Sequence, residues 1–418
     1  MPWDESELPD PKDGTRNGFD MVLENHIDML KAYKYRLCPT KEQKESFLRQ
    51  FGCSRFVWNW ALEAKTKAYA TDKSRLTCFD MILKLPTLKD ENPWLKDAYS
   101  QSLQSQLRSL DSAFTGFFRR VKQGAKEKGY PRFKSRDGRQ SVRFPQGAKA
   151  DFVDGLAVLP KMGGVRARFD RTFDGKVKTV TVSMEPTGKF YVSFLVDDGH
   201  ALPDKQPIDP AKAIGIDLGL ESFLTTSNGD KVANPRFLKQ DLDRIRRLSR
   251  VKSKRSKGGK NRDKARKRLA LAHERARNRR RDFLHKLSTR LIRENQAVCV
   301  EDLSVMGMMG NRKLAKSISD AAWREFIEML RYKSEWQGKH LIEIGRFDPS
   351  SKMCSACGSI NRGLTLGDRR WDCPSCGVSQ DRDHNAATNV LSFGLLKQNL
   401  IGKVPLGQRE VTPAEITQ

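Results

Sequence analysis

Apolar residues recur at a helical spacing between positions 103 and 121. They lie three or four residues apart over about five turns, and Gly124 follows as a helix-ending residue. The apolar positions are Leu103, Leu107, Leu110, Phe114, Phe117 and Val121. The pattern predicts an amphipathic helix in which Phe114 and Phe117 are core residues rather than platforms for nucleobases.

The segment before this helix predicts one strand and two further helices. Residues 32–37 (AYKYRL) alternate as a half-buried strand does, and Thr40 and Gln43 have the spacing of a capping box that opens a helix. The first helix carries Phe47, Leu48 and Phe51, and the second runs through Phe56, Val57, Trp60 and Leu62.

Residues 141–197 change to a pattern of short strands. The runs SVRF, ADFVDGLAVL, GVRARF, KTVTVSM and FYVSFLV are separated by Gly-Gly, Asp-Gly and Pro-Thr-Gly turns. We expect a small β-barrel, which the strand at 32–37 would close from a distance. Residues 204–209, with prolines in and around them, then form the expected linker to the next domain.

The second half of the chain predicts alternating strands and helices. A buried strand ends at Asp217, a second strand follows, and Asn228-Gly229 is a strong hairpin signal. Long helices, a strand ending near Glu301, another helix, a strand, a cysteine-rich segment and a last helix beginning near Asp383 come after it. The order of three strands, helix, strand, helix, strand, helix matches the ribonuclease H topology.

Four cysteines form two Cys-x-x-Cys pairs between residues 354 and 376. Fifteen residues separate the pair Cys354/Cys357 from the pair Cys373/Cys376. Two such knuckles can place four thiolates around one tetrahedral zinc ion, so this spacing predicts a structural zinc ribbon rather than unliganded thiols. The other cysteines, Cys38, Cys53, Cys78 and Cys299, are scattered singly and are expected to be reduced.

Three carboxylates occupy the positions at which the predicted topology would bring them together. Asp217 ends the first strand, Glu301 ends the fourth, and Asp383 opens the last helix. Oxygen ligands are what Mg²⁺ prefers, and two such ions can hold the attacking and leaving oxygens of a phosphodiester displacement. We therefore predict a two-magnesium nuclease site at these three residues, although Asp217 could be a turn residue and Asp383 a helix cap.

Two of these assignments have close competitors. Asp302 is adjacent to Glu301, and we choose Glu301 because it follows the apolar strand directly. Asp381 competes with Asp383, which the small residues Ala386 and Ala387 follow and which we choose as the ligand. His384 is expected to lie at the surface or beside the site, because a magnesium site prefers oxygen.

Charge then identifies the class of partner. The chain has 78 Lys and Arg against 51 Asp and Glu, a net charge of +27, and an isoelectric point near 9.9. Such an excess favours a polyanion as the partner. The sequence has no apolar run long enough for a membrane span, and its acidic N-terminus is unlike a signal peptide, so a cytoplasmic or nucleoid-associated protein is expected.

Two basic stretches are the predicted contacts to nucleic acid. Residues 244–293 combine helical apolar spacing with a coat of Arg and Lys, and SKGGK forms the turn between two helices. Arg279 and Arg280 in this stretch are candidate phosphate contacts. The loop GYPRFKSRDGRQ adds Arg132 and Lys134. A solvated, purely structural charged face is the alternative for each.

At this point the sequence resembles the TnpB proteins of insertion elements, relatives of the type V CRISPR nucleases. The resemblance runs from about residue 32 to about residue 390. It is carried by YKYRLCPTKEQ, CSRFVWNWAL, LDSAFTGFFRRVKQG, GYPRFK, GIDLGLESF, RRRDFLHKLSTRL, VEDLSVMGMM, LAKSISDAAWREFIEMLRYK, PSSKMCSACG and WDCPSCGVSQDRDHNAATNV.

The resemblance implies an RNA-guided DNA endonuclease that holds a structured guide RNA and reads a short motif beside its double-stranded DNA target. It makes Asp217, Glu301 and Asp383 the RuvC triad and the four cysteines a zinc-binding insertion. It also makes Gln104 a candidate motif-reading residue, although Cys78, Ser100 and Gln101 nearby depart from the family pattern.

The expected fold class is α+β and multidomain. It combines a ribonuclease H-like (RuvC) nuclease domain that carries the zinc ribbon, a β-barrel wedge domain and a helical recognition domain. The expected boundaries are 1–30 for a disordered acidic extension, 31–42 and 137–205 for the wedge domain, 43–136 for the recognition domain, 211–350 and 381–395 for the nuclease domain, 351–380 for the ribbon and 396–418 for a C-terminal tail.

Two other functions remain open at this stage. A guided DNA-binding repressor would have lost a carboxylate, whereas all three acids are present here. The other is a role in transposition, as an accessory transposition protein or as the catalyst itself, and we find no recombinase constellation beyond the triad that would support direct catalysis. An RNA-binding module whose nuclease site is vestigial is a further reading. One structural zinc and two catalytic Mg²⁺ are the expected cofactors, and guide RNA and target DNA the expected partners.

Overall fold

A computed structural model describes residues 28–365 and 367–401. The chain divides into two compact units, one ending at Ala201 and one beginning at Leu202. The predicted acidic extension lies almost wholly outside the described residues, as does most of the predicted C-terminal tail. Within the described residues, no helix combines the length and the apolar character that crossing a bilayer requires.

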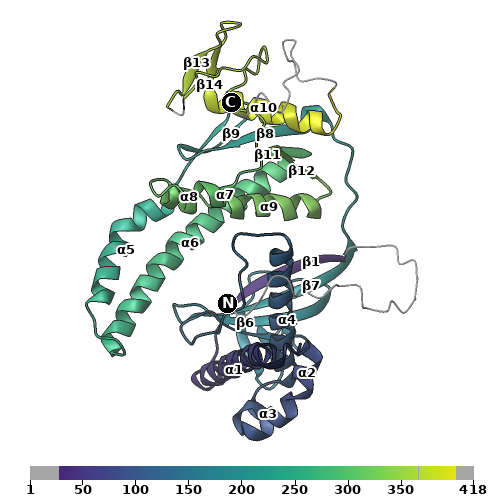
Figure 1. The fold of residues 1–418 in the computed structure, drawn as a ribbon, viewed down its shortest axis with the longest axis vertical. Coiled ribbons are helices and arrows are strands. Elements are labelled where there is room, and N and C mark those ends of the chain that lie inside the picture. The colour runs from purple at the N-terminus through teal and green to yellow at the C-terminus, as the bar shows by residue number, and fades with distance from the viewer. Residues whose placement is uncertain (1–27, 366, 402–418) are drawn as a thin grey trace. The chain divides into compact units, whose positions relative to one another are not determined.

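The first unit contains a seven-stranded antiparallel sheet (Figure 1). Its strands are β1 (Asp28–Leu37), β2 (Gln140–Phe144), β3 (Lys149–Asp151), β4 (Leu156–Leu159), β5 (Gly163–Arg168), β6 (Lys176–Met184) and β7 (Phe190–Ala201), in the order β2-β6-β7-β1-β5-β4-β3. The N-terminal strand that was expected to close a barrel lies in the middle of this sheet, between β7 and β5. The edges are β2 and β3, and no ladder joins them in the described part of the chain, so the closed barrel is corrected to an open sheet.

The helices of this unit are α1 (Lys41–Asp72), α2 (Cys78–Leu83), α3 (Leu85–Glu91), the 3₁₀ helix η2 (Pro93–Asp97) and α4 (Ser100–Lys122). The predicted capping box is present, since Gln43 N donates to Thr40 Oγ1 at 3.3 Å and Thr40 N to Gln43 Oε1 at 3.0 Å. The amphipathic pattern at 103–121 is the core face of α4, and Phe114 and Phe117 are buried.

Helix α1 replaces the two helices predicted for its sequence. Its first half places Phe47 and Phe51 in the core beneath the sheet, whereas its second half places Val57 and Ala61 in a core with α2 and α4. One helix that serves two cores changes its buried face along its length. The apolar pattern therefore breaks near Gly52, although the helix itself continues.

The second unit contains a five-stranded sheet. Its strands are β8 (Ala213–Leu218), β9 (Ser222–Thr226), β10 (Lys231–Ala233), β11 (Ala297–Glu301) and β12 (His340–Ile344), in the order β10-β9-β8-β11-β12. The first three strands are antiparallel, and β8, β11 and β12 are parallel. The predicted order of three strands, helix, strand, helix, strand, helix is confirmed.

Helices cover both faces of this sheet. The helices of this unit are η3 (Pro210–Lys212), α5 (Phe237–Ser253), α6 (Lys260–Glu294), α7 (Val305–Met308), α8 (Ala315–Ala321), α9 (Trp323–Trp336) and α10 (Arg382–Lys397). Side chains of α6 and α9 share one core with the sheet, where the Phe326 and Phe223 rings meet edge to face at 5.2 Å. On the other face, Val390 of α10 packs with Cys299 and Ile342.

The predicted helical pair in the basic stretch is confirmed as a long hairpin of α5 and α6 (Figure 1). Helix α5 begins without a side-chain cap of its own, because Arg236 occupies the cap position in a left-handed conformation. Asp320 of α8 supplies the missing acceptor, and its carboxylate takes hydrogen bonds from Leu238 N at 3.0 and 3.1 Å. Arg280 of α6 lies 3.6 Å from the same carboxylate.

Replacing Asp320 by Ala should loosen α5. The change leaves the half-buried N–H of Leu238 without an acceptor and removes the carboxylate that faces Arg280, a loss of roughly 1–3 kcal/mol. Amide hydrogen exchange should then accelerate in residues 237–253 while the sheet stays protected. Asp243→Ala, which changes an exposed carboxylate on the same helix, is the control, and equal protection of α5 in the two variants would rule out the capping role.

Candidate active site and metal centre

Two strand ends and one helix start bring the three predicted acids together. Asp217 lies in β8 and Glu301 ends β11, and these parallel strands pair up to Ile216 and Val300, one residue before each acid. Asp383 lies in the first turn of α10, the helix that crosses β8 and β11 (Figure 1).

Helix α10 approaches β8 closely because of one glycine. A Cβ on Gly215 would lie 2.2 Å from the carbonyl oxygen of Ala387 and 2.6 Å from Leu391 N, so no side chain fits there. Ala386 and Ala387 are fully buried on the helix side of this contact. The two alanines were expected to permit the approach, whereas Gly215 was not singled out in the sequence.

The acids influence one another electrostatically. The pKa of Asp217 is raised to about 7, first by burial and then by the negative charges of Glu301 and Asp383. Burial, followed by the charge of Asp348, also raises the pKa of Glu301. Several carboxyl groups are thus held where their negative charges are unfavourable without a cation, which is the electrostatic signature of a functional site.

The two competing acids have other partners. Asp381 caps α10, since its Oδ1 accepts from His384 N at 3.1 Å, and its Oδ2 pairs with Lys231 at 2.7 Å. Asp302 pairs with Arg346 at 2.9 Å and is exposed, whereas Glu301 accepts from the Ser350 hydroxyl. These contacts favour Glu301 and Asp383 over Asp302 and Asp381 as the ligands. His384 lies beside the site and contacts the Ser227 carbonyl at 3.1 Å.

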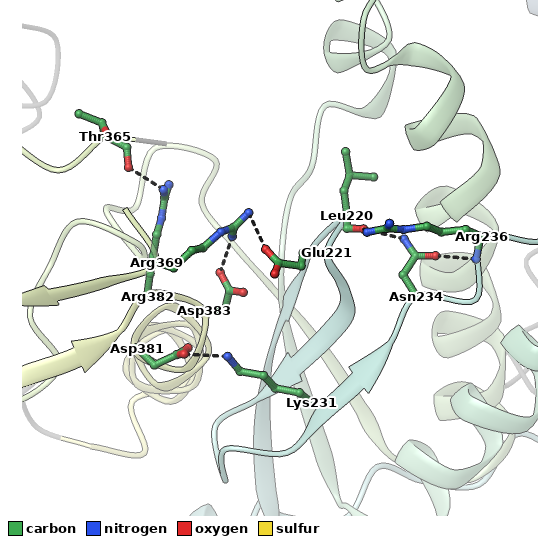
Figure 2. A network of polar contacts seen from close by, with 10 residues as sticks. All are labelled: Leu220, Glu221, Lys231, Asn234, Arg236, Thr365, Arg369, Asp381, Arg382 and Asp383. Carbon is green, nitrogen blue, oxygen red and sulfur yellow. Dashed lines mark hydrogen bonds and ion pairs between the residues drawn. The ribbon is translucent and has the colours of Figure 1, made fainter. Parts of the chain in front are cut away.

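An arginine that the sequence analysis missed bridges two acids at this site. Arg369, just before β13 (Arg370–Asp372), lies 3.3 Å from Asp383 and 3.1 Å from Glu221 (Figure 2). Its guanidinium neutralises part of the acid cluster. Among the described residues, the three predicted ligands do not form a set of oxygens within 4.8 Å of one another, so a pair of metal ions would have to draw Asp383 from Arg369.

The four predicted cysteines do form a compact set. Their sulfur atoms all lie within 4.8 Å of one another, with Cys354 and Cys376 3.8 Å apart and Cys357 and Cys373 3.6 Å apart. A tetrahedron with zinc–sulfur bonds of about 2.3 Å has sulfur–sulfur edges of about 3.8 Å. The residues therefore fit a single tetrahedral metal ion.

Two equivalent turns build this cysteine cluster. In each, a glycine with positive φ donates to the carbonyl of the first cysteine at 2.8 Å, namely Gly358 to Cys354 and Gly377 to Cys373. The second turn connects β13 to β14 (Ser379–Asp381), which runs directly into α10. The remaining cysteines, Cys38, Cys53, Cys78 and Cys299, are all unpaired thiols.

Two buried asparagines of α10 hold the loop that carries the first cysteine turn. Asn385 Nδ2 and Asn389 Nδ2 each donate to the Met353 carbonyl at 2.7 Å, and Asn389 also donates to the Ser350 carbonyl at 2.7 Å. Asn385 Oδ1 accepts from Ser355 N at 2.8 Å. Both side chains are fully buried, and their i, i+4 spacing on a largely apolar helix face was the available sequence signal.

Replacing Asn385 by Ala should detach the first cysteine turn from α10. The change leaves Ser355 N without an acceptor in a dry environment, at a cost of roughly 1–3 kcal/mol. We expect faster release of the bound metal to a colorimetric chelator and faster amide exchange at residues 350–357. Thr388→Ala is the matched control, because Thr388 Oγ1 bonds only within α10, to the His384 carbonyl. Equal release rates for the two variants would argue against the anchoring role.

The five predicted nucleic-acid contacts have unequal surroundings. Gln104 is half-exposed on α4, and Arg132 is exposed. The ammonium of Lys134 lies 3.6 Å from the centre of the Trp58 ring and donates to Gln106 at 3.0 Å. Arg279 contacts Gln240 at 2.6 Å, and Arg280 faces Asp320, so both tie α6 to its neighbours. Gln104 and Arg132 are therefore the members whose side chains are best placed to reach a partner.

Three family models match consecutive parts of the chain. The model OrfB_IS605, described as "Probable transposase", matches residues 183–312, and the model described as "Cas12f1-like, TNB domain" matches residues 323–390. A helix-turn-helix model, HTH_OrfB_IS605, matches residues 29–74, which here form β1 and the single helix α1. The second match contains the four cysteines and Asp383.

The relatives span most of the chain. A protein from Streptomyces pristinaespiralis named "Putative RNA-guided DNA endonuclease" is 41% identical and covers 87% of this chain and 89% of its own. The similarly named InsQ protein from Escherichia coli K12 is 30% identical and covers 87% and 92%. The solved structure of a Cas12f1–sgRNA–target DNA complex shares the fold at a TM-score of 0.51, with 13% identity and coverage of 87% and 99%. The chain belongs to the TnpB family.

Proposed function

We propose that this protein is an RNA-guided DNA endonuclease that uses the carboxylates of Asp217, Glu301 and Asp383 to cut target DNA. The observation that carries the proposal is the convergence of these acids at the ends of β8 and β11 and the start of α10, where burial and then the charges of Glu301 and Asp383 raise the pKa of Asp217. The names of the two full-length relatives support the same activity.

The chain's own residues have three roles in the proposed chemistry. Asp217, Glu301 and Asp383 would hold two Mg²⁺, and those ions would supply charge neutralisation and an activated water for phosphodiester hydrolysis. Ser350 orients Glu301 through its hydroxyl hydrogen bond. The pairing of Asp381 with Lys231 keeps that competing acid in its capping position.

The proposed domain assignment follows the two units. The five-stranded sheet with its helices is a ribonuclease H-like (RuvC) nuclease domain, and residues 351–380 are its zinc ribbon, holding one structural Zn²⁺ at Cys354, Cys357, Cys373 and Cys376. The seven-stranded sheet is the wedge domain, and the helices from α1 to α4 are the recognition domain. A net charge of +27 suits a chain that must hold guide RNA and target DNA together.

Cleavage of a matched duplex tests the proposal. The full chain would be purified with its co-expressed RNA and given Mg²⁺ with a duplex that matches the guide or a scrambled duplex. Cutting of the matched duplex alone is the expected result. Guided binding without cutting would favour a guided DNA-binding repressor. Cutting of both duplexes would show that the RNA does not direct cleavage.

A further inference from the structure

Phe133 is exposed in a segment that is otherwise held firmly. Its side chain is 62% exposed, and within the described residues it has no aromatic partner. It lies in the connection between α4 and β2, which has no regular secondary structure around this residue. An isolated exposed apolar residue is ordinary on a protein surface, so the inference rests on how this one is presented.

Helix α1 holds the backbone on both sides of Phe133. Trp58 Nε1 donates to the Arg132 carbonyl at 3.0 Å, Asn59 Nδ2 donates to the Lys134 carbonyl at 3.0 Å, and Lys134 N donates to Asn59 Oδ1 at 2.8 Å. Three hydrogen bonds from two adjacent side chains thus fix the residues before and after Phe133. Its ring is presented on a rigid support rather than on a loose loop.

Two other side chains of the same loop, Tyr130 and Lys134, pack on aromatic rings of the helices. Tyr130 packs edge to face with Phe114 and Phe117, at 5.6 and 5.3 Å between ring centres. Lys134 lies over the Trp58 ring, and burial lowers the pKa of its ammonium to about 8. Lys134 thus packs on Trp58, whereas the exposed Phe133 ring packs on no aromatic ring among the described residues.

Three arginines lie close to Phe133 in the sequence. Arg132, Arg136 and Arg139 are all exposed. An apolar partner would have to approach these charges, whereas a nucleic acid would place phosphates beside the arginines and a base on the ring. Bases inside a duplex are already stacked on both faces, so only an unstacked base can use the ring.

We propose that Phe133 is a stacking platform for an unstacked nucleobase whose adjoining phosphates contact the arginines of the same loop. The base belongs either to the guide RNA or to the opened target DNA, which offer the same chemistry. This inference rests on the proposed function, since it takes the two nucleic acids named there as partners.

Affinity measurements on three variants at Phe133 test the platform. Phe133→Ala removes the ring, Phe133→Leu keeps an apolar side chain without a π face, and Phe133→Tyr keeps the ring. Val153→Ala is the control, because Val153 is 96% exposed in a turn away from this loop. The RNA that co-purifies with the full chain would be labelled for one arm, and the matched DNA duplex would be titrated onto the assembled complex for the other.

Phe133→Ala should weaken one arm about 5- to 150-fold, the range for loss of one stacked base. Phe133→Tyr should restore the affinity and Phe133→Leu should not. The salt dependence should keep its slope in Phe133→Ala and become shallower in Arg132→Gln, because only the arginine neutralises a phosphate. Loss in the RNA arm assigns the base to the guide, and loss in the DNA arm alone assigns it to the target.

Unchanged affinity in both arms, or full rescue by Phe133→Leu, would overturn the platform. Either result leaves the proposed nuclease intact, provided that the wild-type complex still cuts the matched duplex. Conversely, a wild-type complex that binds the duplex but does not cut it would disprove the nuclease proposal, while the affinities measured for the Phe133 variants would still decide the stacking proposal.

Discussion

Asp217→Asn protein, assembled with its guide RNA, should bind the matched duplex as wild type does and leave it uncut. The substitution preserves the shape of the side chain and removes a negative charge from the centre of the acid cluster. Loss of a metal-binding carboxylate removes several kcal/mol of transition-state stabilisation, so the cleavage rate should fall at least about a thousand-fold. Glu301→Gln and Asp383→Asn should behave alike in the same single-turnover assay.

The neighbouring acids provide matched controls for this result. Asp302→Asn and Asp381→Asn change residues that pair with Arg346 and Lys231, and asparagine remains a good helix cap at position 381. Both variants should keep most of the cleavage activity. A result in which Asp381→Asn is inactive while Asp383→Asn cuts normally would exchange the two assignments.

Stability separates a lost ligand from a damaged fold in the Asp217→Asn variant. The folded-state pKa of Asp217 is about 7 against a reference of 3.8, so the folded protein favours the protonated form and loses stability as pH rises between these values. The amide carries no such penalty. In magnesium-free buffer at pH 8 the variant should therefore unfold at a higher temperature than wild type, with a free energy of unfolding larger by at most about 4 kcal/mol. Both differences should shrink toward pH 5.

Cys354→Ser protein should contain no zinc and should lose the ordered ribbon. Its cluster would retain three thiolates, and structural zinc sites in small domains contribute about 10–16 kcal/mol to folding. Elemental analysis should fall from one zinc per chain to none, and residues 351–380 should lose protection from amide exchange. Cleavage should fall as well, because Ser350, directly before this segment, contacts Glu301, and Arg369, within it, contacts Asp383.

Cys38→Ser is the control for the zinc result, because Cys38 lies far along the chain from the cluster and is an unpaired thiol. It should retain one zinc per chain and normal cleavage. Stoichiometric zinc in the Cys354→Ser variant, or its absence from folded wild-type protein, would disprove the four-cysteine site.

Features with local causes could be predicted from the sequence. The capping box at Thr40 and Gln43 and the two cysteine turns depend on residues a few positions apart, so their spacing alone specifies them. The convergence of the three acids could be predicted because strand ends and a helix start fix where such residues lie, whereas their role as ligands stays a prediction. In each case the chain geometry within one element, or the order of the elements, was sufficient.

Features that depend on the meeting of distant segments could not be predicted. Arg369 reaches Glu221 across the fold, and Asn385 finds its partners in a loop thirty positions away. The barrel was wrong because strand alternation does not reveal which strands are edges. The packing of Lys134 on the Trp58 ring could not be predicted either, because the sequence shows that a residue is basic but not what it contacts.

The asparagine links of α10 bear on how this chain could be shortened or rebuilt. In the sequence the ribbon looks like a removable insertion. Its first turn is nevertheless bound by Asn385 and Asn389 of α10, the helix that also carries Asp383. A compact variant that deletes residues 351–380 would remove the Met353 carbonyl and Ser355 N, two of the hydrogen-bond partners of these buried asparagines, and would leave them the Ser350 carbonyl. Any replacement segment must offer equivalent carbonyl and amide groups there, or the designer must exchange both asparagines for apolar residues at the same time.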